Sequence, residues 1–139
     1  MAAPVLDSFA LLAFLRGEAG GDKVAALLGK AGERDQPLHM TEMNYAEVKF
    51  TIIRKDGAEC WNEVARELPT LAIEFHPITR GLADLAAEFK ARLKMSLADA
   101  CAAALTKEKK AELVTGDAEF KPLEKEIKIT WLKGGVFNR

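Results

Sequence analysis

Short apolar stretches that lead directly into helix-forming segments recur along the chain, and this alternation constrains the fold more than any other feature of the sequence. Residues 3–6 (APVL) have the pattern of a short buried strand and precede a helical segment at residues 9–18 (FALLAFLRGE). Residues 37–40 (PLHM) precede another helical segment, at residues 42–57, in the same way. Strands that alternate with helices are typical of an α/β fold around a mostly parallel sheet.

The rest of the chain continues this order. Further strands are expected at residues 71–78, 111–115 and 126–132, and further helices at residues 22–34, 60–68, 80–94 and after Ser96. Apolar stripes with helical spacing support two of the helices, and their members are Met43, Ala46, Phe50 and Ile53 in one and Leu82, Leu85, Ala86, Phe89 and Leu93 in the other. The predicted N-caps are Thr41, Thr79 and Ser96.

The composition fits one globular domain. With 139 residues, of which 49% are hydrophobic, the chain can bury a sizeable core but is too short for two domains. We therefore expect a single domain over residues 1–139. The formal net charge of -1 excludes the overall basic surface that holds many proteins to nucleic acid by charge alone, so any contact with nucleic acid must be local.

The cysteines and the hydropathy pattern predict a soluble protein of the cytoplasm. Cys60 and Cys101 lie far apart in the sequence, which predicts neither a disulfide framework nor a thiolate zinc site. The apolar run near the amino end is interrupted by Asp7 and Ser8, is too short to span a bilayer and follows no basic segment. We expect no membrane segment and no processing.

Four acidic residues occupy the ends of elements that should meet. Asp7 follows the first predicted strand, Asp117 follows residues 111–115, and Glu47 and Asp99 lie in the early turns of helices. In an open parallel sheet the carboxyl ends of the strands and the amino ends of the following helices share one edge. Clustered carboxylates repel one another unless a cation lies among them, and Mg²⁺ or Mn²⁺ prefers such oxygen ligands.

Each acid taken alone also has an ordinary structural explanation. Asp99 lies three residues after the predicted N-cap Ser96, where an acid completes a variant of the capping box and meets the positive end of the helix dipole. Asp117 follows Gly116, a turn pairing, and can cap the short segment at residues 118–125. The argument for a cation site therefore depends on all four acids meeting.

The motifs that carry these acids resemble those of the PIN domain, and within it the VapC-like toxin ribonucleases of bacterial toxin–antitoxin pairs. The stretch VLDSFALLAFL is similar to the family's opening strand and first acid, and NYAEV to its helical glutamate. MSLADACAAAL and ELVTGDAEFK are similar to the segments with its third and fourth acids. The resemblance runs over nearly the whole chain, in the family's order and spacing.

This resemblance implies a PIN-like three-layer α/β/α sandwich and a metal-dependent endoribonuclease. Asp7, Glu47, Asp99 and Asp117 would bind Mg²⁺ or Mn²⁺ and cleave RNA through metal-activated water. Ser8 and Thr115 would support the site, and Glu119 stands where some relatives carry a further acid. The resemblance also implies a homodimer and a small antitoxin protein that silences the enzyme.

Two other interpretations stay open at this point. A PIN-type nuclease could process RNA without any link to an antitoxin. Alternatively the chain could be a non-catalytic binding module in which the acids serve only as caps and solvated turns.

Several other polar residues have predicted places outside the acidic cluster. His39 and His76 fall in expected strands, which indicates packing residues rather than a paired-histidine ribonuclease site. Arg16, Lys49, Arg54 and Lys55 follow acids along their helices and are candidates to border the site and hold RNA. The lysine cluster at residues 107–110 is interpreted as a solvated helix end.

Overall fold

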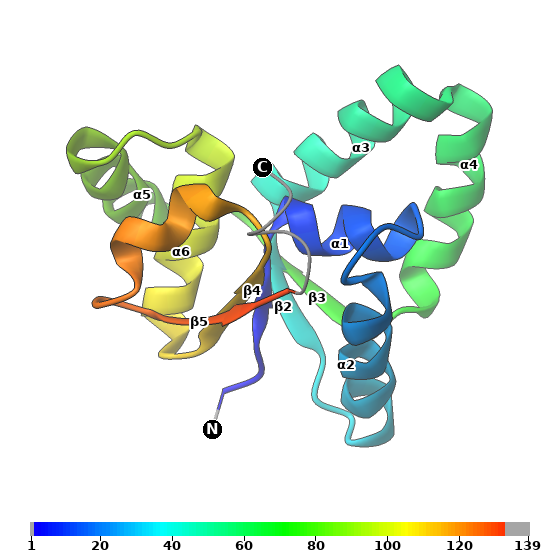
Figure 1. Ribbon diagram of the computed structural model, residues 1–139, viewed down its shortest axis with the longest axis horizontal. Helices are drawn as coiled ribbons and strands as arrows, with labels where there is room; N and C mark the ends of the chain where they lie inside the picture. The colour runs from blue at the N-terminus through cyan, green and yellow to red at the C-terminus, as the bar shows by residue number, and fades with distance from the viewer. Residues whose placement is uncertain (1, 133–139) are drawn as a thin grey trace.

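The computed structural model describes residues 2–132, in which a parallel sheet is the central layer (Figure 1). Its five strands have the order β3-β2-β1-β4-β5, and every pairing is parallel. The strands are β1 (Val5–Leu6), β2 (Leu38–Thr41), β3 (Ile73–His76), β4 (Glu112–Thr115) and β5 (Lys128–Trp131). The predicted α/β sandwich with a parallel sheet is confirmed. The predicted domain also includes Met1 and residues 133–139, which lie outside the described residues.

Helices cover both faces of this sheet. The α-helices are α1 (Ser8–Leu15), α2 (Gly21–Glu33), α3 (Glu42–Asp56), α4 (Ala58–Glu67), α5 (Arg80–Arg92) and α6 (Leu97–Lys109). Short 3₁₀ helices are η1 (Leu68–Thr70) and η2 (Ala118–Leu123). In Figure 1 the pair α5 and α6 lies on one side of the sheet, and α1 to α4 lie on the other.

The period of two along the strands divides the core between these layers. Val5 packs into a cluster with α5 and α6, whereas its neighbour Leu6 packs with α1 and α2. A third cluster joins Met40 of β2 to Leu11 of α1 and to the apolar side chains of α3 and α4. Alternate side chains of one strand therefore hold opposite layers, as expected for a sheet buried on both faces.

Side-chain caps begin the helices at the carboxyl edge of the sheet. The side chains of Thr41, Thr79 and Ser96 each accept a hydrogen bond from a backbone N–H of the following helix, which confirms all three predicted caps. Asp7 caps α1 and Asp117 caps η2 in the same way. Four of these five caps lie at or just after the end of a strand, and Ser96 instead follows α5.

The apolar stripe that predicted a helix at α3 is not the buried face of that helix. On α3 the side chains of Phe50 and Ile53 are exposed, and the buried face instead contains Asn44, Val48 and Ile52. Hydrophobicity does not identify the buried face of α3, because that face includes the polar residue Asn44. Its side chain can be buried because its amide has hydrogen-bond partners. The predicted stripe of α5 is confirmed, with Leu82, Ala86 and Phe89 buried.

Helices α1 and α2 approach each other closely where α2 begins. A Cβ atom added at Gly21 would lie 2.4 Å from the backbone oxygen of Ala13, closer than such atoms can approach. The preceding Gly20 has φ 90°, a left-handed conformation that suits glycine.

None of the helices within residues 2–132 has both the length and the apolar character needed to cross a membrane.

Candidate active site

Asp7 lies at the carboxyl end of the central strand and is 1% exposed. Its Oδ1 accepts a hydrogen bond from the backbone N–H of Ala10 at 2.9 Å, so it caps α1. Its Oδ2 accepts a hydrogen bond from the Thr115 hydroxyl at 2.5 Å, across 108 residues of sequence. This second bond is possible because β4 lies beside β1 in the sheet. The carboxylate is therefore held at both oxygens by the two central strands.

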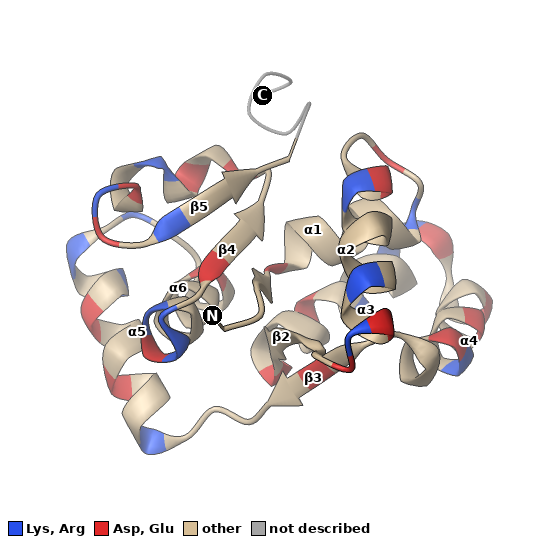
Figure 2. Ribbon diagram, turned by 90° about the horizontal axis from the view of Figure 1, so that it is seen from below, with Lys and Arg blue, Asp and Glu red and all other residues tan. Residues whose placement is uncertain are grey.

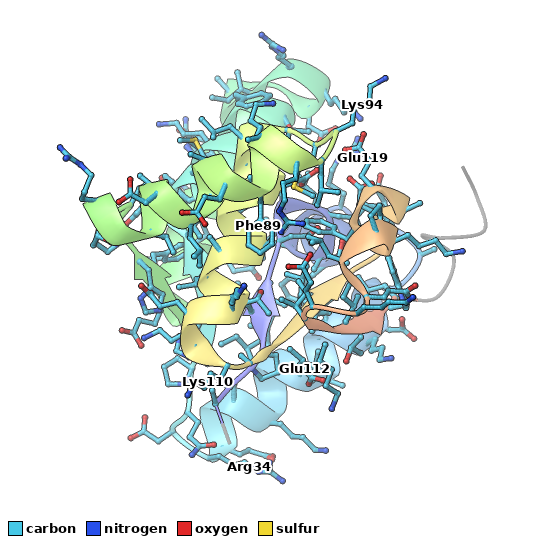
Figure 3. The ribbon with its side chains drawn as sticks, turned by 90° about the vertical axis from the view of Figure 1, so that its left-hand side faces the viewer. Arg34, Phe89, Lys94, Lys110, Glu112 and Glu119 are labelled. Carbon is cyan, nitrogen blue, oxygen red and sulfur yellow. The ribbon has the colours of Figure 1, made fainter. Side chains whose placement is uncertain are left out.

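Thr115 continues this network into the loop after β4. Its hydroxyl oxygen accepts a hydrogen bond from the backbone N–H of Asp117 at 3.0 Å, and Asp117 Oδ1 accepts one from the N–H of Glu119 at 3.0 Å. Both of these acids reach solvent, since Asp117 is half-buried and Glu119 is exposed. Figure 3 shows Glu119 at one end of the molecule and Lys110 and Glu112, which precede and begin β4, at the other.

Asn44 is an organising residue that the sequence analysis did not single out. It is fully buried, and its Nδ2 donates to Ser8 Oγ at 2.9 Å and to the backbone oxygen of Ala98 at 3.3 Å. Its Oδ1 accepts a hydrogen bond from the Thr41 hydroxyl. One amide thus ties α1, the start of α3 and the start of α6 together. The sequence signal that could have identified Asn44 is its position one helical turn before Glu47, which places both side chains on the same side of the helix.

The four predicted acids influence one another electrostatically. The pKa of Asp7 is raised from 3.8 to about 7, chiefly by burial and also by the charges of Asp117 and Glu47, against the hydrogen bonds from Thr115 and Ala10. Burial likewise raises the pKa of Asp99 to about 8, with added repulsion from Asp7, Asp117 and Glu47. The sheet edge therefore carries more negative charge than it can hold without a proton or a cation.

An open pocket of about 270 Å³ lies among these acids. It is lined by Ser8, Phe9, Leu12, Glu47, Thr51, Ser96, Asp99, Asp117 and Glu119. Carboxylate oxygens of Asp99, Asp117 and Glu119 all lie within 4.8 Å of one another, close enough to share one ion. Oxygen donors with solvent access are the set that Mg²⁺ and Mn²⁺ prefer, so the residues present fit such an ion.

The structure gives different positions to the predicted acids. Asp99, Asp117 and Glu119 form the tightest group, and Glu47 lines the same pocket from α3. Asp7 lies behind them, buried, and acts on Asp99 through its charge. Ser8 and Thr115 are joined to the site by the hydrogen bonds described above.

Two of the basic residues considered as a border of the site, Arg16 and Lys49, have other contacts. Arg16 forms ion pairs with Asp56 at 2.9 Å and Glu18 at 2.6 Å, and the Lys49 ammonium lies 5.6 Å from the ring centre of Trp61. Neither cation lines the pocket. The prediction that they hold RNA beside the acids has no support in these contacts.

The histidines lie in strands, as predicted, and both are largely buried. His39 belongs to β2 and His76 to β3, and their ring nitrogens Nδ1 and Nε2 lie 2.9 Å apart. Burial and then the charges of His76 and Lys109 lower the pKa of His39, so its imidazole is neutral at pH 7. The pair shares no residue with the acidic pocket.

Solved structures with the same fold include chains of toxin–antitoxin complexes. The DNA-bound VapBC of Salmonella typhimurium aligns with TM-score 0.70 and 13% identity over 94% of this chain and 98% of that one. VapBC2 of Rickettsia felis bound to a promoter fragment aligns with TM-score 0.69 and 14% identity over 94% and 99%. VapC20 of Mycobacterium tuberculosis, described as a toxin that cleaves the Sarcin-Ricin loop, aligns with TM-score 0.70 and 16% identity over 86% and 94%.

Among curated proteins no sequence match is found. The family model of the PIN domain, in contrast, matches residues 5–126. That range includes all four predicted acids and every strand except β5. The resemblance inferred from the motifs is confirmed, and the chain belongs to the PIN-domain family.

Proposed function

We propose that this protein is an Mg²⁺- or Mn²⁺-dependent endoribonuclease, the toxin of a toxin–antitoxin pair. The observation that carries the proposal is that Glu47, Asp99, Asp117 and Glu119 line one open pocket at the carboxyl edge of the sheet, and that the charge of buried Asp7 acts on Asp99 from behind it. A cluster of this kind lowers the stability of the fold unless a cation compensates its charge. Substrate has access because the pocket is open to solvent.

In this proposal some residues offer oxygens to the ion, and others hold those residues in position. Asp99, Asp117 and Glu119 offer the oxygens nearest to one another, and Glu47 faces them from α3. Thr115 and the N–H of Ala10 hold the Asp7 carboxylate, whose charge adds to the field of the pocket. Bound Mg²⁺ or Mn²⁺ supplies an activated water and a counter-charge for the phosphate. The Asn44 amide holds Ser8 and the starts of α3 and α6 in fixed positions relative to one another.

Solved structures of toxin–antitoxin complexes with the same fold support an antitoxin partner. Solved neighbours of the same fold come from VapBC complexes and from a toxin–antitoxin complex of Klebsiella pneumoniae, which matches with TM-score 0.65 and 17% identity over 93% of this chain and 96% of that one. We extend this to a small antitoxin bound to the present chain, to a homodimer and to a place in the cytoplasm. RNA is the proposed substrate.

The test is cleavage of a mixed RNA pool by purified protein with Mg²⁺, with Mn²⁺ and with chelator. Asp7→Asn and Asp117→Asn are expected to reduce metal-dependent cleavage by about 100-fold or more, the effect of removing one preorganised electrostatic contact. The matched control is Asp84→Asn on the exposed face of α5, which should cleave as the wild type does.

Cleavage that persists in both variants, or that chelator leaves unchanged, would refute the assignment and favour a non-catalytic binding module. A nuclease that cleaves but does not arrest growth when expressed without its neighbouring genes would instead be an RNA-processing enzyme. The growth assay therefore separates the toxin from the nuclease.

A further inference from the structure

A second group of metal-ligating side chains lies on the strands β2 and β3. It consists of His39, Glu74 and His76, and one ligand atom from each lies within 4.8 Å of the other two. His39 Nδ1 lies 2.9 Å from His76 Nε2 and 4.0 Å from Glu74 Oε1, and His76 Nε2 lies 4.0 Å from Glu74 Oε2. Three donors of two kinds therefore converge on one point.

The register of the sheet brings these residues together. His39 is paired directly with Glu74, and His76 lies two residues further along the same strand. Their neighbours Leu38, Met40, Ile73 and Phe75 pack toward the clusters of α1 to α4, so alternation turns the three donors toward the opposite side of the sheet. Lys109 of α6 acts on His39 from that side. The arrangement is thus built by paired strands and not by mobile loops.

Burial distinguishes this cluster from a chance grouping of surface residues. The side chains of His39 and His76 are 13% and 15% exposed, whereas Glu74 is 56% exposed. The two imidazoles are therefore fixed in position, and the carboxylate closes the group from the solvent side. Figure 2 shows β3 at the edge of the sheet beside β2, with acidic colour on the strand.

The donor set defines the chemical class of ion. Two imidazoles and one carboxylate suit Zn²⁺ and similar borderline ions, whereas Mg²⁺ prefers oxygen ligands alone. Tetrahedral zinc with bonds of about 2.0–2.1 Å places its ligand atoms about 3.3 Å apart. The nitrogen–nitrogen separation of 2.9 Å and the nitrogen–oxygen separations of 4.0 Å, each to a different oxygen of Glu74, differ from this value by less than about 1 Å. A water from the exposed side can complete four ligands.

We propose that His39, Glu74 and His76 form a binding site for Zn²⁺ or a chemically similar transition-metal ion, separate from the acidic pocket. An ion bound there would have ligands from both strands and so link the edge strand β3 to β2. Coordination requires protons on the outer nitrogens, His39 Nε2 and His76 Nδ1, so that both inner nitrogens are free. Without the ion, one inner nitrogen must carry the proton of the hydrogen bond between the rings.

Because the chain contains only two histidines, the ring nitrogens can be observed without interference. The experiment is a ¹H–¹⁵N spectrum of the imidazoles in untagged protein labelled at histidine, recorded after removal of metal and again with one equivalent of Zn²⁺. We expect both inner nitrogens to shift together and the outer nitrogens of both rings to be protonated. Unchanged ring signals at two equivalents of Zn²⁺ would overturn the proposal, including the case in which Zn²⁺ binds elsewhere.

Affinity measured by equilibrium dialysis against Zn²⁺ tests the individual ligands. Glu74→Gln is expected to weaken binding by about 10–100-fold and His76→Gln by at least as much, whereas Glu63→Gln on the exposed face of α4 should leave it unchanged. Lys109→Met should tighten binding because it removes a nearby positive charge. Equal affinity in the wild type and Glu74→Gln would exclude the carboxylate as a ligand and overturn the site as proposed.

Discussion

A carboxylate at a helix start can act as a cap and as part of a charged site at the same time. Asp7 uses one oxygen for the N–H of Ala10 and the other for the hydroxyl of Thr115. An ionised carboxylate has about four acceptor positions, so these two bonds do not exhaust it. The ordinary structural explanation of the acids and the functional one are therefore compatible, which is why neither could be excluded from any single acid.

Asp99 provides the sharpest test at this scale. Asp99→Asn removes a carboxyl that must either hold a proton or add charge to a crowded group in the metal-free fold, while Ser96, which forms the cap, stays in place. In chelator we expect the variant to melt about 3–6 °C higher than the wild type, and to gain less from added Mn²⁺. Thermal unfolding across a series of Mn²⁺ concentrations measures both effects.

The control for this measurement is Asp84→Asn on α5, which lies outside the pocket and should melt as the wild type does in every condition. If Asp99→Asn also matched the wild type at all Mn²⁺ concentrations, Asp99 would be neither a source of repulsion nor a ligand.

At the scale of elements, the junction of α1 and α2 depends on the absence of a side chain. Gly21→Ala would place Cβ 2.4 Å from the Ala13 oxygen, and the resulting shift of α2 should lower the free energy of unfolding by about 1–3 kcal/mol. Gly29→Ala, in the same helix, meets no atom within 4 Å and should raise it by about 0.5–1 kcal/mol. Urea unfolding of both variants checks the opposite signs.

If the two substitutions changed stability equally, the close approach of α1 and α2 would not control the position of α2. Gly29 is the appropriate partner for this comparison because it shares the helix and the chemistry of the change with Gly21.

Most elements were predictable because local signals agreed with the tertiary structure. Caps at Thr41, Thr79 and Ser96 start helices as expected, and the predicted strands contain the observed ones apart from the final residue of β2, Thr41. The face of α3 was not predictable from hydrophobicity, because Asn44 is buried through bonds to distant residues. The hydrogen bond from Thr115 to Asp7 was likewise not predictable from local sequence, because it depends on the order of strands in the sheet.

At the scale of the whole molecule, the raised pKa values of Asp7 and Asp99 predict how stability depends on pH. The folded chain keeps protons on these carboxyls up to about pH 7 and 8, whereas the unfolded chain loses them near 3.8. Between these limits the folded state binds more protons, so metal-free protein should become less stable as pH rises from about 4 to 8. Thermal unfolding in chelator at several pH values measures this slope.

Added Mn²⁺ should oppose the loss most strongly at the upper end of the range, where the carboxylates are ionised and free to bind it. The double variant Asp7→Asn/Asp99→Asn should show a flatter dependence. A wild-type melting temperature that rose with pH over this window would contradict the raised pKa values.

The adjacency of β1 and β4 also has a consequence for protein synthesis. Asp7 emerges early from the ribosome, but Thr115, which holds it, and Asp117 and Glu119 emerge more than 100 residues later. A chain that ends before residue 115 lacks the hydroxyl that holds Asp7 and two of the acids that line the pocket. If the proposed function holds, RNA in the cell meets a complete site only after residue 119 has been added and β4 has docked against β1.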